Sequence, residues 1–148
     1  MKYFIYFSAT GNGDLLADIL KEKGYTPIKV ETIKPLGKMN FFRILKYGGH
    51  AMMNKKANIK PLNIDIKEDD TVIIGSPIWN DRLSTPINAV LDQFEFDKKK
   101  TTFILYPAGK TTNKSKSQIA KLGFEGQIIV TPYPKKYIDK TKSALNVL

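Results

Sequence analysis

Small and hydroxyl-bearing residues near the start of the chain have the spacing of an anion-binding turn. An apolar run over residues 3–7 precedes an amphipathic segment that begins at Asp14. Between them lie Ser8, Ala9, Thr10, Gly11, Asn12 and Gly13. Small residues let successive backbone N–H groups converge on one anion, and a helix start adds unpaired donors and the positive end of its dipole. The pattern predicts a phosphate cradle between a strand and a helix.

The same residue types also suit a purely structural turn. Ser, Thr and Asn cap helices, and glycine tolerates positive φ, so any tight strand-to-helix connection favours them. The chain lacks the Gly-x-x-x-x-Gly-Lys-Ser/Thr pattern of a nucleoside triphosphate loop and the Gly-x-Gly-x-x-Gly pattern of a dinucleotide site. A structural turn and a cradle the size of one phosphate therefore both remain open.

The cradle resembles the phosphate loop of the flavodoxin family, which is usually written Thr/Ser-x-Thr-Gly-Asn-Thr. The resemblance implies FMN as the cofactor. It places around the FMN phosphate Ser8, Ala9, Thr10, Gly11, Asn12 and Gly13. One position departs from the family, because Gly13 replaces the closing hydroxyl residue and removes one phosphate hydrogen bond.

A second informative stretch follows the β-branched run at residues 71–75, which predicts a central strand buried on both faces. We expect it to open into a polar loop over residues 76–86 that holds the only tryptophan, Trp79. Open α/β sheets bind ligands beyond the carboxyl ends of their strands, where the strand order reverses, so this loop should meet the cradle. Trp79 would there either face a flat ligand group or act only as a hydrophobic plug.

The segment Gly75-Ser76-Pro77-Ile78-Trp79 resembles the Gly-Thr-Pro-Ile/Val-Trp segment of one flavodoxin branch, which flanks the isoalloxazine ring. The resemblance implies a first wall of the ring site formed by Ser76, Pro77, Ile78, Trp79, Asn80 and Asp81. Family members often have glycine where this chain has Asn80-Asp81. Because Asn and Asp are the next most tolerant of positive φ, we expect a peptide flip there to be possible but costlier.

A further buried strand over residues 101–106 ends at the position of the family's second flanking loop. The resemblance implies a second wall formed by Tyr106, Pro107, Ala108 and Gly109. Tyr106 would either stack on the ring or belong to the core. Lys110 is expected to add positive charge beside the ring.

Length and composition indicate one ordinary globular domain over residues 1–148, with 42% hydrophobic residues. No apolar run reaches the roughly 20 residues of a membrane-spanning helix, and none resembles a signal-peptide core, so we expect a cytoplasmic protein. The chain has no cysteine and one histidine, His50, which excludes thiolate and histidine-cluster metal sites.

The formal net charge of +10 is the unusual feature of the composition. The lysines are scattered, only Arg43 and Arg82 are arginine, and no aromatic RNA-binding motif is present, which disfavours nucleic acid as the main ligand. A basic protein should instead associate with acidic docking surfaces in a salt-sensitive manner.

Apolar spacing along the rest of the chain alternates between helical and strand periods. We expect an edge strand at residues 25–33, marked by Pro27, and a helix at 39–56 that bends at Gly48-Gly49 and buries its aromatic and methionine side chains. The other expected elements are helices at 14–24, 84–94, 113–123 and 136–148 and a strand at 127–130. The alternation predicts an α/β three-layer sandwich with a five-stranded parallel sheet, and the resemblance implies strand order 2-1-3-4-5.

No titratable pair converges on the expected site, so we assign no catalytic residue and favour a carrier over a hydrolase or transferase. With the resemblance, this points to a flavodoxin, an FMN-binding electron-transfer flavoprotein that shuttles electrons between redox partner proteins as a monomer or weak dimer. An alternative is an FMN-dependent NAD(P)H:quinone-type oxidoreductase on the same fold. A third is a regulatory module whose cradle holds another phosphate or none.

Overall fold

The computed structural model of the chain describes residues 1–38, 41–53, 55–109 and 111–148. In chain order the elements are β1 (Lys2–Tyr6), α1 (Asn12–Glu22), β2 (Thr26–Lys29), α2 (Phe41–Met52), β3 (Thr71–Trp79), β4 (Arg82–Leu83), α3 (Thr85–Gln93), β5 (Thr102–Pro107), α4 (Asn113–Lys121), β6 (Ile128–Val130), α5 (Ile138–Ala144) and the short 3-10 helix η1 (Leu145–Val147). Two expectations from the sequence fall on residues outside these ranges. They are the burial of Met39 in the helix expected at residues 39–56 and the positive charge of Lys110 beside the ring.

The sheet has the expected topology. Its strands follow the order β2-β1-β3-β5-β6 with parallel pairing along this path, and β4 pairs only with β3. Counting the parallel strands alone, this is the order 2-1-3-4-5, so the α/β prediction is confirmed. β3 lies at the centre of the sheet and β2 at an edge. Because β2 pairs only with β1, its outer side has no neighbouring strand to which Pro27 would need to donate a hydrogen bond.

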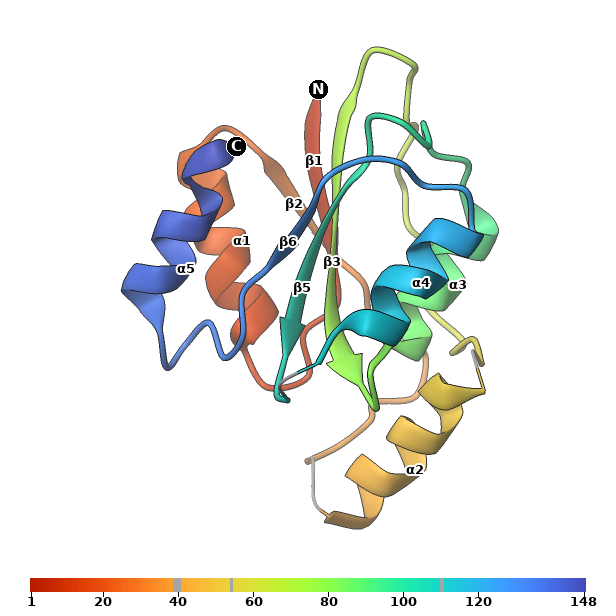
Figure 1. Cartoon of the computed structure of the whole chain (residues 1–148). Coiled ribbons are helices and arrows are strands. Elements are labelled where there is room, and N and C mark those ends of the chain that lie inside the picture. The colour runs from red at the N-terminus through yellow and green to blue at the C-terminus, as the bar shows by residue number, and fades with distance from the viewer. Residues whose placement is uncertain (39–40, 54, 110) are drawn as a thin grey trace.

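Helices cover both faces of the sheet, as Figure 1 shows, with α1 and α5 on one face and α3 and α4 on the other. Alternate residues of each strand feed two separate cores. Phe4 and Ile104 pack with Leu16 of α1, whereas Ile5 and Phe103 pack with Ile87 of α3. α2 lies beyond the carboxyl ends of the strands (Figure 1).

The expected loop after Gly75 is wrong. β3 continues to Trp79, turns tightly through Asn80 and Asp81, and returns as β4, which pairs antiparallel with β3. Ser76, which looks like a loop residue, is completely buried. Its hydroxyl accepts a hydrogen bond from the Ser84 N–H at 3.0 Å and lies 3.2 Å from the Ser84 hydroxyl, so the hairpin satisfies this polar group internally.

The helix expected at residues 39–56 is α2, which continues through Gly48-Gly49, so the helix is not broken at the glycines. Its expected burial is wrong for three described side chains, whereas Tyr47 is half-buried and packs against Trp79. Phe42 is 80% exposed, Leu45 58% and Met53 67%. These three apolar side chains are exposed because α2 lies beyond the strand ends rather than on a face of the sheet.

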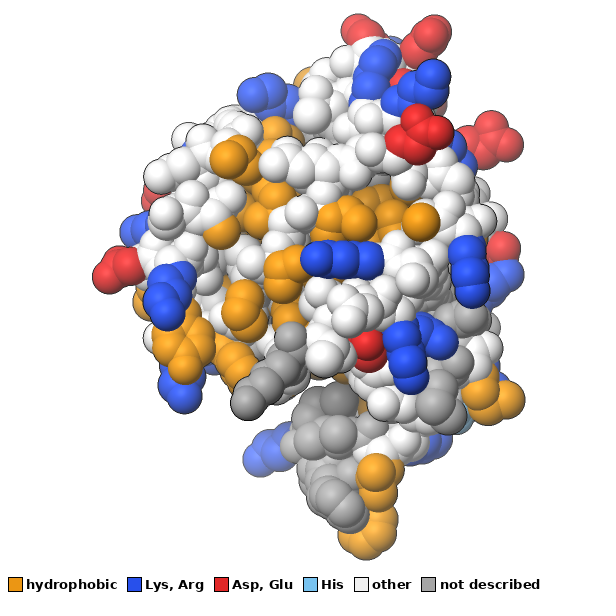
Figure 2. All heavy atoms as spheres, viewed as in Figure 1, with side chains coloured by type: hydrophobic (Ala, Val, Ile, Leu, Met, Phe, Trp, Pro, Cys, Tyr) orange, Lys and Arg blue, Asp and Glu red, His pale blue; other side chains and the backbone are white. Residues whose placement is uncertain are grey.

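Basic side chains are spread over the surface rather than gathered in one patch, as Figure 2 shows for one face of the molecule. Ion pairs on the described surface include Lys56 with Asp92 and Lys60 with Glu31. Of the helices that the structure describes, none combines the length and the apolar character needed to cross a membrane.

Candidate functional site

A cavity of about 600 Å³ opens where the carboxyl ends of β1, β3 and β5 meet. The chain leaves β1 toward β2 on one side, and β3 lies on the other side, so this is the point at which strand order reverses. Of the residues that the sequence predicted, the lining includes Ala9, Thr10, Asn12, Gly13, Pro77, Ile78, Trp79, Asn80, Asp81, Tyr106, Pro107, Ala108 and Gly109. The topology thus brings the cradle and both walls to one place.

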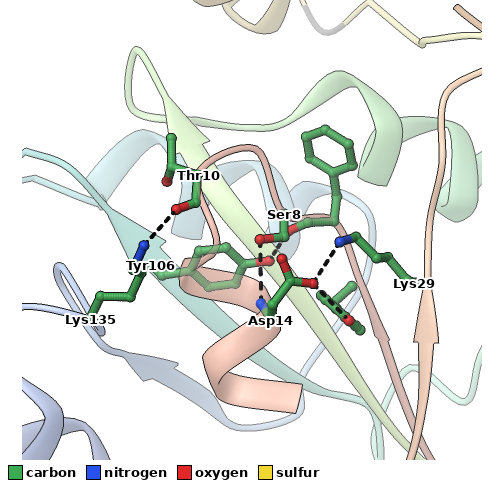
Figure 3. Close-up of polar contacts among 8 residues, drawn as sticks. Ser8, Thr10, Asp14, Lys29, Tyr106 and Lys135 are labelled. Carbon is green, nitrogen blue, oxygen red and sulfur yellow. Dashed lines mark hydrogen bonds and ion pairs between the residues drawn. The ribbon is translucent and has the colours of Figure 1, made fainter. Parts of the chain in front are cut away.

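Three expected residues are not among those that line the cavity, namely Ser8, Gly11 and Ser76. The Ser8 hydroxyl accepts a hydrogen bond from the Asp14 N–H at 3.3 Å, which satisfies one donor of the first turn of α1 (Figure 3). Gly11 begins that helix with φ 87°, a conformation that glycine adopts without strain. Ser76 is buried in the β3–β4 hairpin, whereas Ser8 and Gly11 are half-buried and shape the start of α1.

The cradle holds its own shape through short polar contacts. The Asn12 side-chain amide donates to the Thr10 hydroxyl at 3.3 Å, and the Leu15 N–H donates to the Gly11 carbonyl at 3.1 Å. Thr10 is exposed and Asn12 half-buried, so their polar atoms are available to a ligand at the start of α1. The arrangement has the donors and the helix dipole that an anion requires.

Gly13 packs so closely that no side chain fits there. A Cβ atom at this position would lie 2.9 Å from the Phe7 carbonyl oxygen, 2.9 Å from the Ser8 Cβ and 2.9 Å from a ring carbon of Tyr6. This explains the departure of this chain from the flavodoxin loop, because the closing hydroxyl residue would collide with β1 and the loop that follows it.

Asp14 occupies the first turn of α1, but its charge is already compensated. Its carboxylate lies 2.7 Å from the Lys29 ammonium (Figure 3). It also accepts a hydrogen bond from the Tyr6 hydroxyl at 3.1 Å. Partial burial opposes ionisation, but hydrogen bonds from Lys29 and Ser8 outweigh it and lower the pKa of Asp14. Burial and the Asp14 charge together raise the pKa of Tyr6, so the phenol stays protonated.

Trp79 anchors the first wall within an aromatic cluster. Its ring lies 5.7 Å from Phe7, edge to face, and 5.8 Å from Tyr47 of α2. The side chain is half-buried and borders the cavity. Phe7 and Tyr47 hold the ring in place, while another part of it remains available to a flat ligand. A residue that only plugged the core would not need to border the cavity.

The turn after Trp79 has both central residues in the left-handed region, with φ 51° at Asn80 and 57° at Asp81. Such φ values suit a two-residue hairpin loop and favour Asn, Asp or Gly. The Asp81 carboxylate also reaches the other side of the cavity. Its Oδ2 atom accepts hydrogen bonds from the Thr111 hydroxyl at 3.0 Å and from the Lys114 N–H at 3.2 Å, which ties the first wall to the start of α4.

Hydrogen bonds from two tyrosines, Tyr106 and Tyr133, hold the second wall in place. The Tyr106 side chain is buried, its hydroxyl donates to the Phe7 carbonyl, and burial raises its pKa well above the usual value. Tyr106 is thus a core residue that joins β5 to the cradle rather than a ring that stacks at the surface. Tyr133 donates through its hydroxyl to the Ala108 carbonyl and through its N–H to the Pro107 carbonyl.

Several residues around the site were missed from the sequence. Leu45 and Gly49 of α2 and Thr111 line the cavity, and Tyr133 and Lys135 reach the walls and cradle from the segment after β6. The helical spacing of α2 suggested a core helix, so its role at the site was hidden. The segment after β6 could have been found from its position in the sequence, because it follows the carboxyl end of a predicted strand, where such sheets bind ligands.

The site suits binding more than acid–base chemistry. Asp81 is the only carboxylate that lines the described part of the cavity, and no cluster of three metal-ligating side chains occurs among the described residues. Small and apolar residues make up most of the lining, with a few polar side chains such as Thr10, Asn12 and Thr111, as is usual in sites that bind a cofactor.

Comparisons with known proteins agree with the fold. No protein-family model matches the sequence, and no curated protein matches it. The chain is similar to a flavoprotein from Lactobacillus acidophilus NCFM crystallised in complex with FMN, with a TM-score of 0.70 and 22% identity over 94% of this chain and 96% of that one. The apo-form of a flavoprotein from the same organism gives a TM-score of 0.59 and 23% identity over 94% of this chain and 95% of that one.

A candidate flavoprotein from Bacteroides eggerthii gives a TM-score of 0.64 and 19% identity over 99% of this chain and 98% of that one. These likenesses extend over nearly the whole length of each protein. Together with the strand order, they establish a flavodoxin-like α/β fold.

Proposed function

We propose that this protein binds one FMN noncovalently and carries electrons between redox partner proteins. The observation that carries the proposal is the convergence of the cradle and both walls on one cavity of about 600 Å³. This volume lies within the range of about 300–1,000 Å³ that is usual for cofactor sites. A solved structure of similar fold is a flavoprotein in complex with FMN, which supports the same ligand.

An unsatisfied atom in the site fits such a ligand. The Asp81 Oδ1 atom is buried and has no hydrogen-bond partner among the residues that the structure describes. A buried acceptor without a donor is destabilising, so a ligand N–H group that donates to this atom would strengthen binding. The pyrimidine part of a flavin ring carries such a group, and the exposed backbone at Ala108 and Gly109 can serve its carbonyls.

The bound flavin supplies the redox chemistry, and the chain supplies position and environment. Asn12, Thr10 and the N–H groups that open α1 orient the phosphate. Trp79, backed by Phe7 and Tyr47, provides a fixed aromatic wall that keeps water from one part of the ring. The Asp81 carboxylate ties the first wall to the start of α4, so it holds the turn at Asn80 and Asp81 in place.

We favour a carrier over a reductase. A reductase would also need side chains that position a second substrate, and Asp81 is the only carboxylate that lines the described part of the cavity. With a formal charge of +10, this protein should dock on acidic surfaces of its partners, and the association should weaken as salt rises.

The test is an absorption spectrum of the purified protein before and after addition of FMN and desalting. One flavin per chain, with quenching of the Trp79 fluorescence, is the expected result, because Trp79 is the only tryptophan and borders the cavity. Protein that neither retains nor takes up FMN would contradict the proposal. Rapid NAD(P)H oxidation with a quinone acceptor would instead support the reductase.

A further inference from the structure

Lys135, in the segment that joins β6 to α5, lies directly on the cradle. Its ammonium donates a hydrogen bond to the Thr10 carbonyl at 3.3 Å, and its backbone N–H donates to the Asn12 side-chain oxygen at 3.1 Å. Figure 3 shows the side chain extending toward Thr10. A Cβ atom on Gly11 would lie 3.3 Å from the same ammonium, so the glycine leaves room for this close approach.

The backbone around Lys135 is anchored on the protein. The Tyr133 hydroxyl donates to the Ala108 carbonyl, and the Tyr133 carbonyl accepts hydrogen bonds from the N–H groups of Lys136, at 2.9 Å, and Tyr137, at 3.0 Å. The following helix, α5, leads into Leu145, which is buried in the same core as Leu16 of α1. Lys135 is thereby placed over the cradle by tertiary packing.

The Asp14 carboxylate, in the first turn of α1, does not compensate the charge of Lys135. Asp14 is paired with Lys29 and bonded to Tyr6, and its chain neighbour Gly13 carries no side chain. Among the described residues, the Lys135 ammonium forms no ion pair within 4.0 Å. An ammonium has three donors, and the Thr10 carbonyl requires one of them, so two can serve an anion held in the cradle.

We infer that Lys135 is a cationic ligand of the flavin phosphate and makes the site select FMN over unphosphorylated riboflavin. This inference rests on the proposed function. The ammonium would offset the phosphate charge at a loop whose closing hydroxyl is absent at Gly13. Charge-assisted hydrogen bonds are the stronger kind, and one from an exposed lysine weakens with salt.

The test measures the dissociation constants of FMN and riboflavin for the wild-type protein and three variants, Lys135→Ala, Lys135→Arg and Lys136→Ala. Lys136 is the matched control, because it is adjacent and exposed, and its ammonium lies 5.3 Å from the centre of the Tyr137 ring. Each alanine variant lowers the formal charge of +10 by one, so long-range electrostatics change equally.

We expect Lys135→Ala to weaken FMN binding by about tenfold and to leave riboflavin binding unchanged. Lys136→Ala should change neither constant, and Lys135→Arg should retain most of the FMN affinity. The dissociation constant of FMN should rise with salt concentration more steeply for the wild type than for Lys135→Ala. Thermal unfolding of each variant checks that the fold is intact.

Equal FMN affinities for the wild type and Lys135→Ala would overturn the inference while leaving the proposed function in place. Equal weakening of FMN and riboflavin would also overturn it, because it would indicate a structural role. A wild-type protein that binds neither flavin would overturn the proposed function itself.

Discussion

Restoring the missing hydroxyl of the cradle by Gly13→Thr should destabilise the folded protein and should not increase its affinity for FMN. In a flavodoxin-like loop the change would add a donor for phosphate. Here the new Cβ would lie 2.9 Å from three atoms, of which one is a backbone oxygen and the others belong to Ser8 and the buried Tyr6. Non-bonded carbon atoms prefer separations of about 3.5–4.0 Å, so the loop would have to move away from β1.

The magnitude follows from two opposing effects. Overpacking of this kind costs about 1–3 kcal/mol. Replacing glycine lowers the entropy of the unfolded chain, which returns about 0.4–1 kcal/mol. The free energy of unfolding should therefore fall by about 1.3 kcal/mol at the middle of these ranges and by at most about 2.6 kcal/mol. For a domain of this size the middle value corresponds to a melting temperature lower by roughly 3–5 °C.

The assay is urea unfolding of Gly13→Ala, Gly13→Thr and the control Gly49→Ala. Gly49 lies within α2, and no heavy atom lies within 4 Å of the Cβ it would gain, so alanine there should stabilise by about 0.5–1 kcal/mol. FMN affinity of Gly13→Thr should fall or stay unchanged. A Gly13→Thr protein that is as stable as the wild type and binds FMN more tightly would refute the reasoning.

Three further predictions concern the supports of the site. Tyr106→Phe leaves the Phe7 carbonyl without its buried donor and should lower the free energy of unfolding by about 1–3 kcal/mol, whereas an unchanged urea midpoint would exclude this role. Asp81→Ala should weaken FMN binding more than Thr111→Val, measured by fluorescence titration, because Asp81 ties the first wall to the start of α4 through two hydrogen bonds and Thr111 contributes one. Since the pKa of Asp14 is lowered in the folded state, its stabilisation is present at neutral pH and lost as the pH falls through that pKa, so Asp14→Asn should destabilise at pH 7 and lose this difference in strong acid.

Local spacing determined most of the elements and their order along the chain, although it missed the hairpin of β3 and β4. The apolar run at 3–7 and the β-branched run at 71–75 predicted the strands β1 and β3 because strands buried on both faces need continuous apolar sequence. The amphipathic segment after Asp14 likewise predicted α1. Alternation of strand and helix then restricts the chain to few topologies, so the location of the site at the strand ends followed as well.

Tertiary packing decided what polar and aromatic residues do. Ser76 reads as a loop residue until Ser84 provides its buried partner, and Tyr106 could face a ligand or the core until the Phe7 carbonyl accepts its hydroxyl. Lys135 is one of many scattered lysines in the sequence, and only the packing of the segment after β6 places it on Thr10. Such partners are distant in the chain, and the free energy of a buried hydrogen bond depends on which groups the fold brings together, so local spacing cannot specify them.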